Sequence, residues 1–484
     1  MTGNTARHER THALAPAVRN PGRGLNTTQP AHGRDRHLFC EPHPPAGQTV
    51  AAGGATAGAP WSVRRGERKV RHVSHVETPP SPLQTQDAEV HAWLQREDRR
   101  QANTLTMIAS ENHCSAAVRE ACGSRITDKY AEGYPNRRYY GGCEAADGIE
   151  ELARQRAMQL FGAEDANVQP HSGTTANLAA LTALAGPGGR IVGMALKAGG
   201  HLSHGHDRSH SGMLFSAKQY GVDGSGRIDL DDVRKVVREH QPKVLIAGGS
   251  SYARNIDYAG FAEIAREFGA HLMADIAHPA GLVAAGVVPS PVGIADVVTM
   301  TTHKTLRGPR GGMILAKAEA AKAIRSAVFP GAQGGPLVQQ IAGKAVAFGE
   351  ALRPEFKTYQ QRVKDNANWL AECLIEAGLD IVTGGTDNHI VLVDLRKADV
   401  TGAEVEERAL AAGLAVNKNA IPDDPRPPMV TSGLRLGTPA VTTRGFGHDE
   451  IQAVARVIVG LVRGGDPDSF RATVQQLCEA YPLP

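Results

Sequence analysis

Lys304 is the residue whose surroundings point most directly to chemistry. It follows the mostly apolar stretch 295–298 and lies in the segment 299–312, which places hydroxyl groups before the lysine and glycines after it. A lysine at the end of a strand can form a Schiff base with an aldehyde cofactor. Burial beside a cation such as Arg310 would lower the pKa of its amine and make it a nucleophile. The segment therefore suggests pyridoxal phosphate, with a surface lysine in a loop as the alternative.

Asp275 is a second residue in a position that suits this cofactor. It ends the apolar run 270–274 and precedes Lys304 by 29 residues, about the length of one βαβ unit. A carboxylate there can keep a pyridine nitrogen protonated, and the pyridinium then stabilises a carbanion at the α-carbon of the substrate. An aspartate that only caps a helix is the alternative.

Further motifs occur in a fixed order between about residues 105 and 446. They are Ile108–Asn112, Lys129–Pro135, Arg138–Glu144, Asn167–Gly173, the Lys304 segment, Phe329–Gly331, Gln333–Pro336, Gly384–His389 and Val416–Asn419. Through these motifs the sequence resembles serine hydroxymethyltransferase, a pyridoxal-phosphate-dependent family. The resemblance implies reversible transfer of the hydroxymethyl group of L-serine to tetrahydrofolate, the co-substrate, which gives glycine and 5,10-methylenetetrahydrofolate.

A phosphate site is predicted at Ser172, Gly173 and Thr174, just before the apolar stretch 176–184. Backbone N–H groups and hydroxyls at a helix N-terminus bind anions. A plain helix cap is the alternative. The family that the chain resembles usually has Ser-Gly-Ser-Gln here, so Thr175 lacks an amide that contacts the phosphate region.

The resemblance implies roles for other residues around the cofactor. His201 would stack on the ring, Ser250 and His278 would lie at its phenolic oxygen, and His303 would influence reaction specificity. A structural histidine is the alternative for each imidazole. Three further positions would reach the phosphate from a neighbouring subunit, so a complete site would form only in a homodimer. They are Tyr130, Gly334 and Gly335.

Substrate recognition needs a cation for the carboxylate of the amino acid. Arg435 matches the family position, and a guanidinium binds a carboxylate through two parallel hydrogen bonds. Ser110 and Tyr140 would assist. Glu132 is the predicted acid/base group, because a carboxyl group in a partly dry site can remain protonated and exchange a proton with the hydroxymethyl group or the pterin. The positions that match the folate site are Leu196, Gly200, Leu202, Tyr139 and Asn419.

Four departures from the family pattern leave a rival open. They are Thr175, Ala198 in place of a usual His, Ser209–Gly212 in place of Asn-Phe-Ser-Gly, and Pro427–Met429 in place of Ser-Pro-Phe. The rival is a relative with another substrate: a folate-independent aldolase for threonine or other β-hydroxy amino acids, a transaldolase, or a 2-methylserine hydroxymethyltransferase. A different class, an RNA-binding protein on a degenerate enzyme fold, is disfavoured because the residues that the reaction needs, Asp275, Lys304 and Arg435, are all present.

Composition limits the class of protein. The chain has 484 residues, 41% hydrophobic and 21% charged, which fits a globular enzyme of two domains. It contains no apolar run as long as a membrane span and no secretory signal at its start, so we expect a cytoplasmic protein without a membrane partner. The six cysteines lack metal-ligand spacing, which predicts free thiols and no metal site.

The basic charge of the chain lies in its N-terminal tail. Residues 1–76 contain 11 Arg plus Lys and 4 Asp plus Glu, whereas the remainder contains 42 and 46. The basic residues are dispersed and aromatic residues are few, so we expect no nucleic-acid partner. A mitochondrial transit peptide, or a start codon assigned upstream of the true one, is the alternative explanation of this tail.

The chain is expected to have a disordered basic extension (1–82), an N-terminal arm (83–125) with a helix near 87–97, a large pyridoxal-phosphate-binding domain (126–345) and a small C-terminal domain (346–484). The resemblance implies the α/β architecture of fold type I, with a mostly parallel, seven-stranded type of sheet. The expected strands are 190–194, 243–247, 271–274, 390–395 and 433–436, and the expected helices include one through Phe261, Ile264, Ala265 and Phe268, a connector at 354–377 and a final helix at 449–463.

Overall fold

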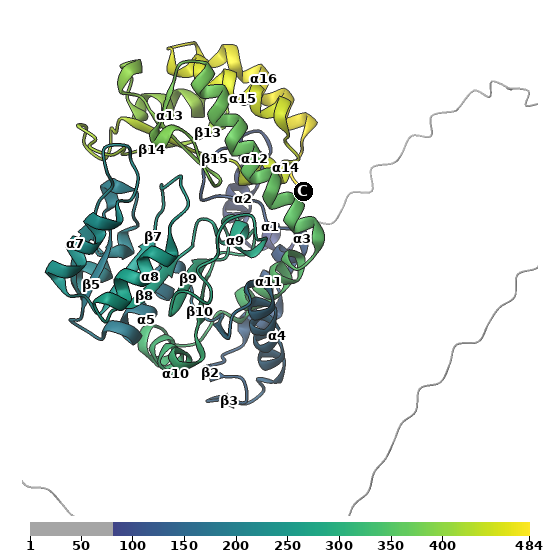
Figure 1. Cartoon of the computed structure of the whole chain (residues 1–484). Coiled ribbons are helices and arrows are strands. Elements are labelled where there is room, and N and C mark those ends of the chain that lie inside the picture. The colour runs from purple at the N-terminus through teal and green to yellow at the C-terminus, as the bar shows by residue number, and fades with distance from the viewer. Residues whose placement is uncertain (1–80) are drawn as a thin grey trace, which may run out of the picture. The chain divides into compact units, whose positions relative to one another are not determined.

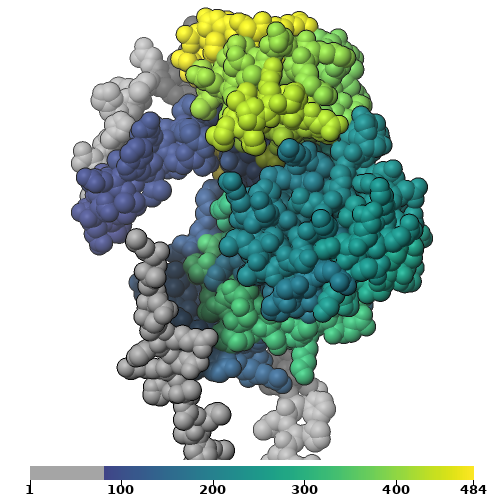
Figure 2. Space-filling model, turned by 90° about the vertical axis from the view of Figure 1, so that its left-hand side faces the viewer, coloured from purple at the N-terminus to yellow at the C-terminus, as the bar shows by residue number. Residues whose placement is uncertain are grey.

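The structure, a computed structural model, describes residues 81–484. The predicted extension, 1–82, lies outside the described residues except for its last two. The described chain begins with α1 (Pro82–Gln86) and α2 (Ala88–Ala102), neither of which has a buried residue. Figure 2 shows this segment in purple, standing away from the rest of the described chain. The chain then continues through β1 (Leu105–Thr106), α3 (Ala116–Cys122), η1 (Arg125–Asp128) and the hairpin β2 (Gly133–Tyr134) and β3 (Arg137–Arg138).

A seven-stranded sheet forms the centre of the large domain (Figure 1). Its strands are β4 (Asp165–Asn167), β5 (Arg190–Met194), β6 (Ser216–Tyr220), β7 (Val244–Gly248), β8 (His271–Asp275), β9 (Val297–Thr301) and β10 (Gly312–Ala316). Their order is β4-β10-β9-β8-β7-β5-β6, and only β10 runs antiparallel to its neighbours. The predicted α/β class with a mostly parallel sheet is confirmed.

Helices cover both faces of this sheet. On one face lie α4 (Glu144–Phe161), α7 (Leu230–His240), α8 (Tyr258–Glu267), α9 (Ala280–Ala284) and α11 (Val338–Ala351), and on the other lie α5 (Gly173–Ala185) and α10 (Ala318–Ser326). In β7, Leu245 and Ala247 pack with the first set, whereas Val244 and Ile246 pack with the second. Since side chains alternate across a strand, this double burial requires the continuous apolar run seen in the sequence.

The small domain has its own sheet and its own core. Strands β11 (Asp380–Ile381), β12 (Ile390–Asp394), β15 (Gly433–Gly437) and β14 (Asn417–Asn419) pair antiparallel in this order, while β13 (Leu414–Ala415) pairs with β1. Helices α12 (Pro354–Glu376), α13 (Gly402–Ala411), α14 (Pro439–Arg444) and α15 (His448–Val462) pack around it. The long helix α12 joins the two domains, because Phe356 and Val363 belong to the core of the large domain and Leu370 and Leu374 to that of the small one.

The expectation that 449–463 is the final helix is wrong. After α15 and Gly464–Gly465 the chain forms α16 (Pro467–Ala480), which begins with Asp466 as N-cap and proline at its first position. Phe470, Val474, Leu477 and Cys478 follow helical spacing and pack into or against the core of the small domain, so the sequence contained the pattern of this helix and the prediction overlooked it. The remaining short elements are η2 (Leu196–Ala198), η3 (Leu202–His204), α6 (His210–Met213), η4 (Ala327–Ala332), η5 (Val382–Gly384) and η6 (Arg396–Ala398).

Residues 81–484 lack two features that would mark other classes of protein. None of the helices there combines the length and apolar composition that a membrane crossing requires. No cluster of three or more His, Cys, Asp or Glu side chains in that range is arranged to hold a metal ion. The five cysteines of the described chain are all free.

Candidate active site

A cavity of about 310 Å³ opens at the carboxyl ends of the parallel strands, where ligands of α/β folds bind. The N-terminal arm, the start of α5, η3 and the segments that follow β7, β8 and β9 all contribute to its wall. Its lining consists of Ser110, Glu111, Ser172, Gly173, Thr174, Asn177, His201, His204, Gly249, Ser250, Asp275, Ala277, Thr301, His303, Lys304 and Arg310. The fold therefore brings together nine of the residues predicted from the sequence: Ser110, Ser172, Gly173, Thr174, His201, Ser250, Asp275, His303 and Lys304.

Lys304 is buried in the wall of this cavity, with 8% of its surface exposed. Burial lowers the pKa of its amine to about 8; Asp275 opposes this shift, and the charges of Arg435 and Arg310 add to it. The backbone on which Lys304 sits is held by its neighbours, since Asn112 Nδ2 donates to Lys304 O (3.0 Å) and Thr305 Oγ1 donates to His278 O (2.6 Å). A surface lysine in a loop is therefore excluded.

A network of side chains from distant segments supports that backbone. Asn112 Nδ2 also donates to Tyr359 Oη (2.9 Å), and Thr443 Oγ1 donates to Asn112 Oδ1 (2.7 Å). The arm, α12 and α14 thus meet behind the Lys304 turn. Sequence reasoning assigned the Asn112 motif to the family without predicting this contact.

Asp275, the last residue of β8, is buried in the lining of the cavity, and its carboxylate accepts three hydrogen bonds. Its Oδ2 accepts from Asn177 Nδ2 (2.8 Å) and His204 Nε2 (2.9 Å), and its Oδ1 accepts from Ala277 N (2.9 Å). Burial alone would raise the pKa of this carboxyl, but the bonds from His204 and Asn177 and the nearby His201 hold it well below its usual range. It is not a helix cap, because the next helix, α9, is capped by Pro279.

His204 and Asn177 were missed by the sequence analysis. His204 Nδ1 accepts from His201 N (3.2 Å), which leaves the ring hydrogen on Nε2 for Asp275. Asn177 is the one amide in helix α5, whose other residues are apolar or carry hydroxyls. This amide was the only feature of the sequence that could have identified it as a site residue. Both side chains hold Asp275 ionised.

His201 is partly buried at the side of the cavity. Its Nδ1 accepts from Ser203 N (3.2 Å), and burial lowers the pKa of the imidazole to about 4. A neutral, flat ring at this place can stack on an aromatic ligand. His303 is similarly neutral, since burial and then the charges of Arg310 and Lys304 lower its pKa to about 3.

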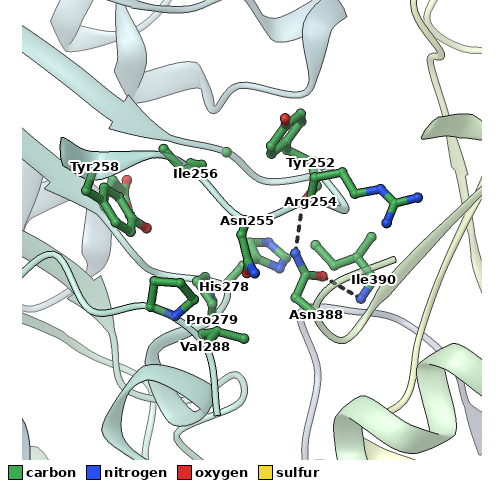
Figure 3. Close-up of a pocket in the computed structure, with 13 residues that line it drawn as sticks. Tyr252, Arg254, Asn255, Ile256, Tyr258, His278, Pro279, Val288, Asn388 and Ile390 are labelled. Atoms are coloured by element: carbon green, nitrogen blue, oxygen red, sulfur yellow. Dashed lines mark hydrogen bonds between the residues drawn. The ribbon is translucent and has the colours of Figure 1, made fainter. Parts of the chain in front are cut away.

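His278 does not line the main cavity; it lies in a separate small cavity between the two domains (Figure 3). That cavity has a volume of about 30 Å³ and is also lined by Asp275 and Asn388. His278 Nδ1 lies 3.3 Å from His389 Nε2, with the two rings 16° from parallel. Asn388 joins the domains there, since its Nδ2 donates to Tyr252 O (3.2 Å).

Arg435, in the middle of β15, points its guanidinium toward the large domain. Its Nη1 donates to Ser250 O (3.1 Å) and its Nη2 to Asn417 Oδ1 (3.1 Å), while the buried Nε has no partner among residues 81–484. Burial lowers its pKa to about 10, so it remains charged at neutral pH. This partly buried cation is no surface arginine, but it does not line the Lys304 cavity, and its unpartnered Nε is itself buried.

The predicted phosphate site lies at the N-terminus of α5. Ser172 is indeed the N-cap, since its Oγ accepts from Thr175 N (3.1 Å), and Thr175 Oγ1 lies 3.0 Å from the same atom. The departure at Thr175 thus replaces an amide with a hydroxyl that holds the cap. Gly173 and Thr174 line the cavity, so the N–H groups at the start of this first turn lie where they can meet an anion.

These groups together fit pyridoxal phosphate. A buried amine with a lowered pKa, an ionised carboxylate and a neutral imidazole surround one cavity, and a helix N-terminus supplies an anion site at its edge. The amine can bind the aldehyde of the cofactor, the carboxylate its pyridine nitrogen, the imidazole its ring and the helix N-terminus its phosphate.

A second group of predicted residues forms a cluster of its own. Tyr130 Oη donates to Glu132 Oε1 (3.3 Å), the rings of Tyr130 and Tyr140 are 4.8 Å apart, and a Cβ at Gly334 would lie 3.2 Å from Glu132 Oε1. None of them lines the Lys304 cavity. Within one chain the structure therefore does not bring Glu132, Tyr130, Tyr140, Gly334 and Gly335 to that cavity.

The predicted folate residues are divided between these regions. Leu196 and Leu202 flank His201 in η2 and η3 with 42% and 47% of their surfaces exposed, and Gly200 lies between them. Tyr139 is 76% exposed and packs against Phe329, beside the second cluster. Asn419 lies in β14 of the small domain.

Two departures from the family pattern have a structural role. Ser209 Oγ and Ser211 Oγ both donate to Leu202 O, at 2.6 and 3.1 Å, so the segment 209–212 fixes the backbone of a predicted folate residue. Ala198 packs against the core of the large domain. In contrast, the Met429 side chain is 77% exposed, and nothing in the described chain explains the change at 427–429.

Comparison with known proteins agrees with this geometry. A family model described as serine hydroxymethyltransferase matches residues 83–458. The chain is 55% identical over 401 residues to proteins named serine hydroxymethyltransferase from Acidovorax sp. (strain JS42) and Acidovorax ebreus (strain TPSY), which covers 82% of this chain and 97% of each relative. The chain therefore belongs to the serine hydroxymethyltransferase family.

Proposed function

We propose that the Lys304 cavity is the place where this chain performs the reaction of its family. That reaction is the pyridoxal-phosphate-dependent interconversion of serine and glycine, with tetrahydrofolate as co-substrate. The observation that carries the assignment is the buried Lys304 amine, with its lowered pKa, in one cavity with the ionised Asp275.

The residues of the cavity would divide the work of holding the cofactor. Lys304 would hold its aldehyde carbon, Asp275 its pyridine nitrogen, His201 its ring, and Ser172–Thr174 its phosphate. Ser250 would serve its phenolic oxygen, whereas His278 lies in the separate small cavity and would have to turn toward the Lys304 cavity to reach that atom. When bound, pyridoxal phosphate supplies an electron sink for the electron pair released at the α-carbon of the substrate.

The substrate would be held by the small domain. Arg435 would bind the serine carboxylate, with help from Ser110 of the arm. This pairing fixes which bond of the α-carbon faces the electron sink. Glu132 would move a proton at the hydroxymethyl oxygen, with Tyr140 nearby, and Leu196, Gly200, Leu202, Tyr139 and Asn419 would bind the folate.

A shared site in a homodimer would unite the two clusters. Glu132, Tyr130, Gly334 and Gly335 lie outside the Lys304 cavity of their own chain, so a neighbouring subunit would have to bring them there. The arm supports such an assembly, because Val90, Trp93 and Leu94 form one exposed apolar face of α2. Such a face gains stability when a second copy covers it.

Complementation between inactive variants tests the shared site. Co-expression of Lys304→Ala chains with Glu132→Gln chains is expected to restore up to about a quarter of the wild-type activity, since half of the dimers are hybrids with one intact site each. Hybrids of Lys304→Ala with Asp275→Asn should stay inactive, because both residues line the same cavity. Failure of the first pair to complement would show that Glu132 acts within its own chain or not at all.

A folate requirement tests the reaction itself. Purified protein with pyridoxal phosphate is expected to convert serine to glycine at least about 10-fold faster with tetrahydrofolate than without it, because the released one-carbon unit needs an acceptor. Glycine and methylenetetrahydrofolate should form in equal amounts. Cleavage of threonine that exceeds serine conversion and ignores tetrahydrofolate would identify the aldolase instead.

We also infer that the chain works in the cytoplasm. The free state of Cys114, Cys122, Cys143, Cys373 and Cys478 is typical of a reducing compartment.

A further inference from the structure

Lys344 is a completely buried cation that the reaction does not use directly. It lies in α11, and 1% of its surface is exposed. Its Nζ donates to three backbone carbonyls, Val168 O (2.6 Å), Gly312 O (2.8 Å) and Pro170 O (3.1 Å). An ammonium group has three N–H donors, so these acceptors satisfy it completely.

The three carbonyls belong to two segments that build the active site. Val168 and Pro170 lead into the predicted phosphate site, whereas Gly312 follows the Lys304 turn and begins β10. The two backbones touch at this place, since Gly312 N donates to Pro170 O (3.0 Å) and a Cβ on Gly312 would lie 2.2 Å from Ser172 O. Lys344 therefore ties both segments together from behind.

The charge of Lys344 also reaches the site. Burial lowers its pKa to about 7, opposed by Glu150 and Cys122, and its own charge contributes to the lowered pKa values of His171 and His303. A neutral amine has only two N–H groups, so one of these three hydrogen bonds would be lost, which favours the ammonium form.

We propose that Lys344 is a positioning residue for the phosphate group of the cofactor. By holding Val168 and Pro170 against Gly312, it fixes the backbone that presents Ser172, Gly173 and Thr174, and it places a positive charge behind them. This inference rests on the proposed phosphate-binding role of those three residues. Lys344 does not touch the ligand; it acts through the backbone that does.

The test compares two ligands that differ only in the phosphate. Pyridoxal phosphate and pyridoxal are titrated into the cofactor-free wild type and Lys344→Met, and binding is followed by absorbance. The variant is expected to bind pyridoxal phosphate at least about 10-fold more weakly and pyridoxal within about twofold of the wild type. Equally weakened binding of both ligands, or no weakened binding, would overturn the proposal, because neither result would be specific to the phosphate group.

Three further variants keep this result interpretable. Lys344→Gln keeps an amide donor but no charge, and it should show a smaller phosphate-specific loss even where Lys344→Met does not fold. Val457→Ala weakens the core of the small domain and should leave both affinities unchanged. Ser172→Ala separates the two proposals: a phosphate-specific loss there, with none in either Lys344 variant, would overturn the role of Lys344 and leave the phosphate site standing.

Discussion

Replacement of Lys304 by alanine is expected to lower kcat/KM for serine by at least about 1,000-fold, even with pyridoxal phosphate in excess. Among residues 81–484, no second amine lines the cavity to replace it, and the other cations near it are the guanidinium groups of Arg310 and Arg435. A guanidinium stays protonated and is no nucleophile at neutral pH. The measurement is glycine formation from serine and tetrahydrofolate.

Lys317→Ala is the matched control for this variant. Lys317 follows β10, which runs antiparallel, so it lies at the opposite edge of the same sheet, where its Nζ pairs with Asp296 (3.1 Å). It should keep wild-type activity. More than about a tenth of wild-type turnover in Lys304→Ala would contradict the assignment of Lys304 as the residue that holds the cofactor.

Asp275→Asn is expected to lower kcat by about 100- to 1,000-fold while the cofactor stays bound. The amide has no negative charge to keep the pyridine nitrogen protonated, and the electron sink weakens. It also loses an acceptor, because one of the three donors that now meet the carboxylate would face an NH2 group. Single-turnover rates at saturating serine, with cofactor content measured by absorbance, check this expectation.

The control for Asp275→Asn is Asp296→Asn. Asp296 also accepts a backbone hydrogen bond, from Leu272 N (2.9 Å), but it lies at the other end of the strands. Equal activity losses in the two variants would show that the Asp275 effect is one of folding and not of cofactor electronics.

Much of the site could be predicted from the sequence because its main residues lie at or just after the ends of central strands. Lys304 and Asp275 follow continuous apolar runs, and such runs become the central strands β9 and β8. Adjacent parallel strands end at the same edge, so residues 29 positions apart in the sequence meet in one cavity. The same argument gave β5 with its observed bounds and β7 to within one residue.

Other features left little signal in the sequence. Asn177 and Lys344 are isolated polar residues in mostly apolar helices, His204 is one of several histidines in a polar stretch, and their partners are backbone or side-chain atoms from other segments. The position of Glu132 outside the lining of the Lys304 cavity depends on the hairpin β2-β3. Arg138 of this hairpin donates to Ala131 O and Gly133 O on either side of Glu132. Pattern reasoning predicts elements, whereas these contacts depend on how elements pack.

The hydrogen bonds that meet behind the Lys304 turn also bear on the order in which the chain matures. Asn112 contacts Lys304, Tyr359 and Thr443, which follow it by 192, 247 and 331 residues. Closing loops of this length is slow compared with forming a local helix or a βαβ unit. The sheet can therefore assemble first, and the lysine turn takes its final shape only after the last third of the chain has docked. We therefore expect cofactor capture to be a late event in folding.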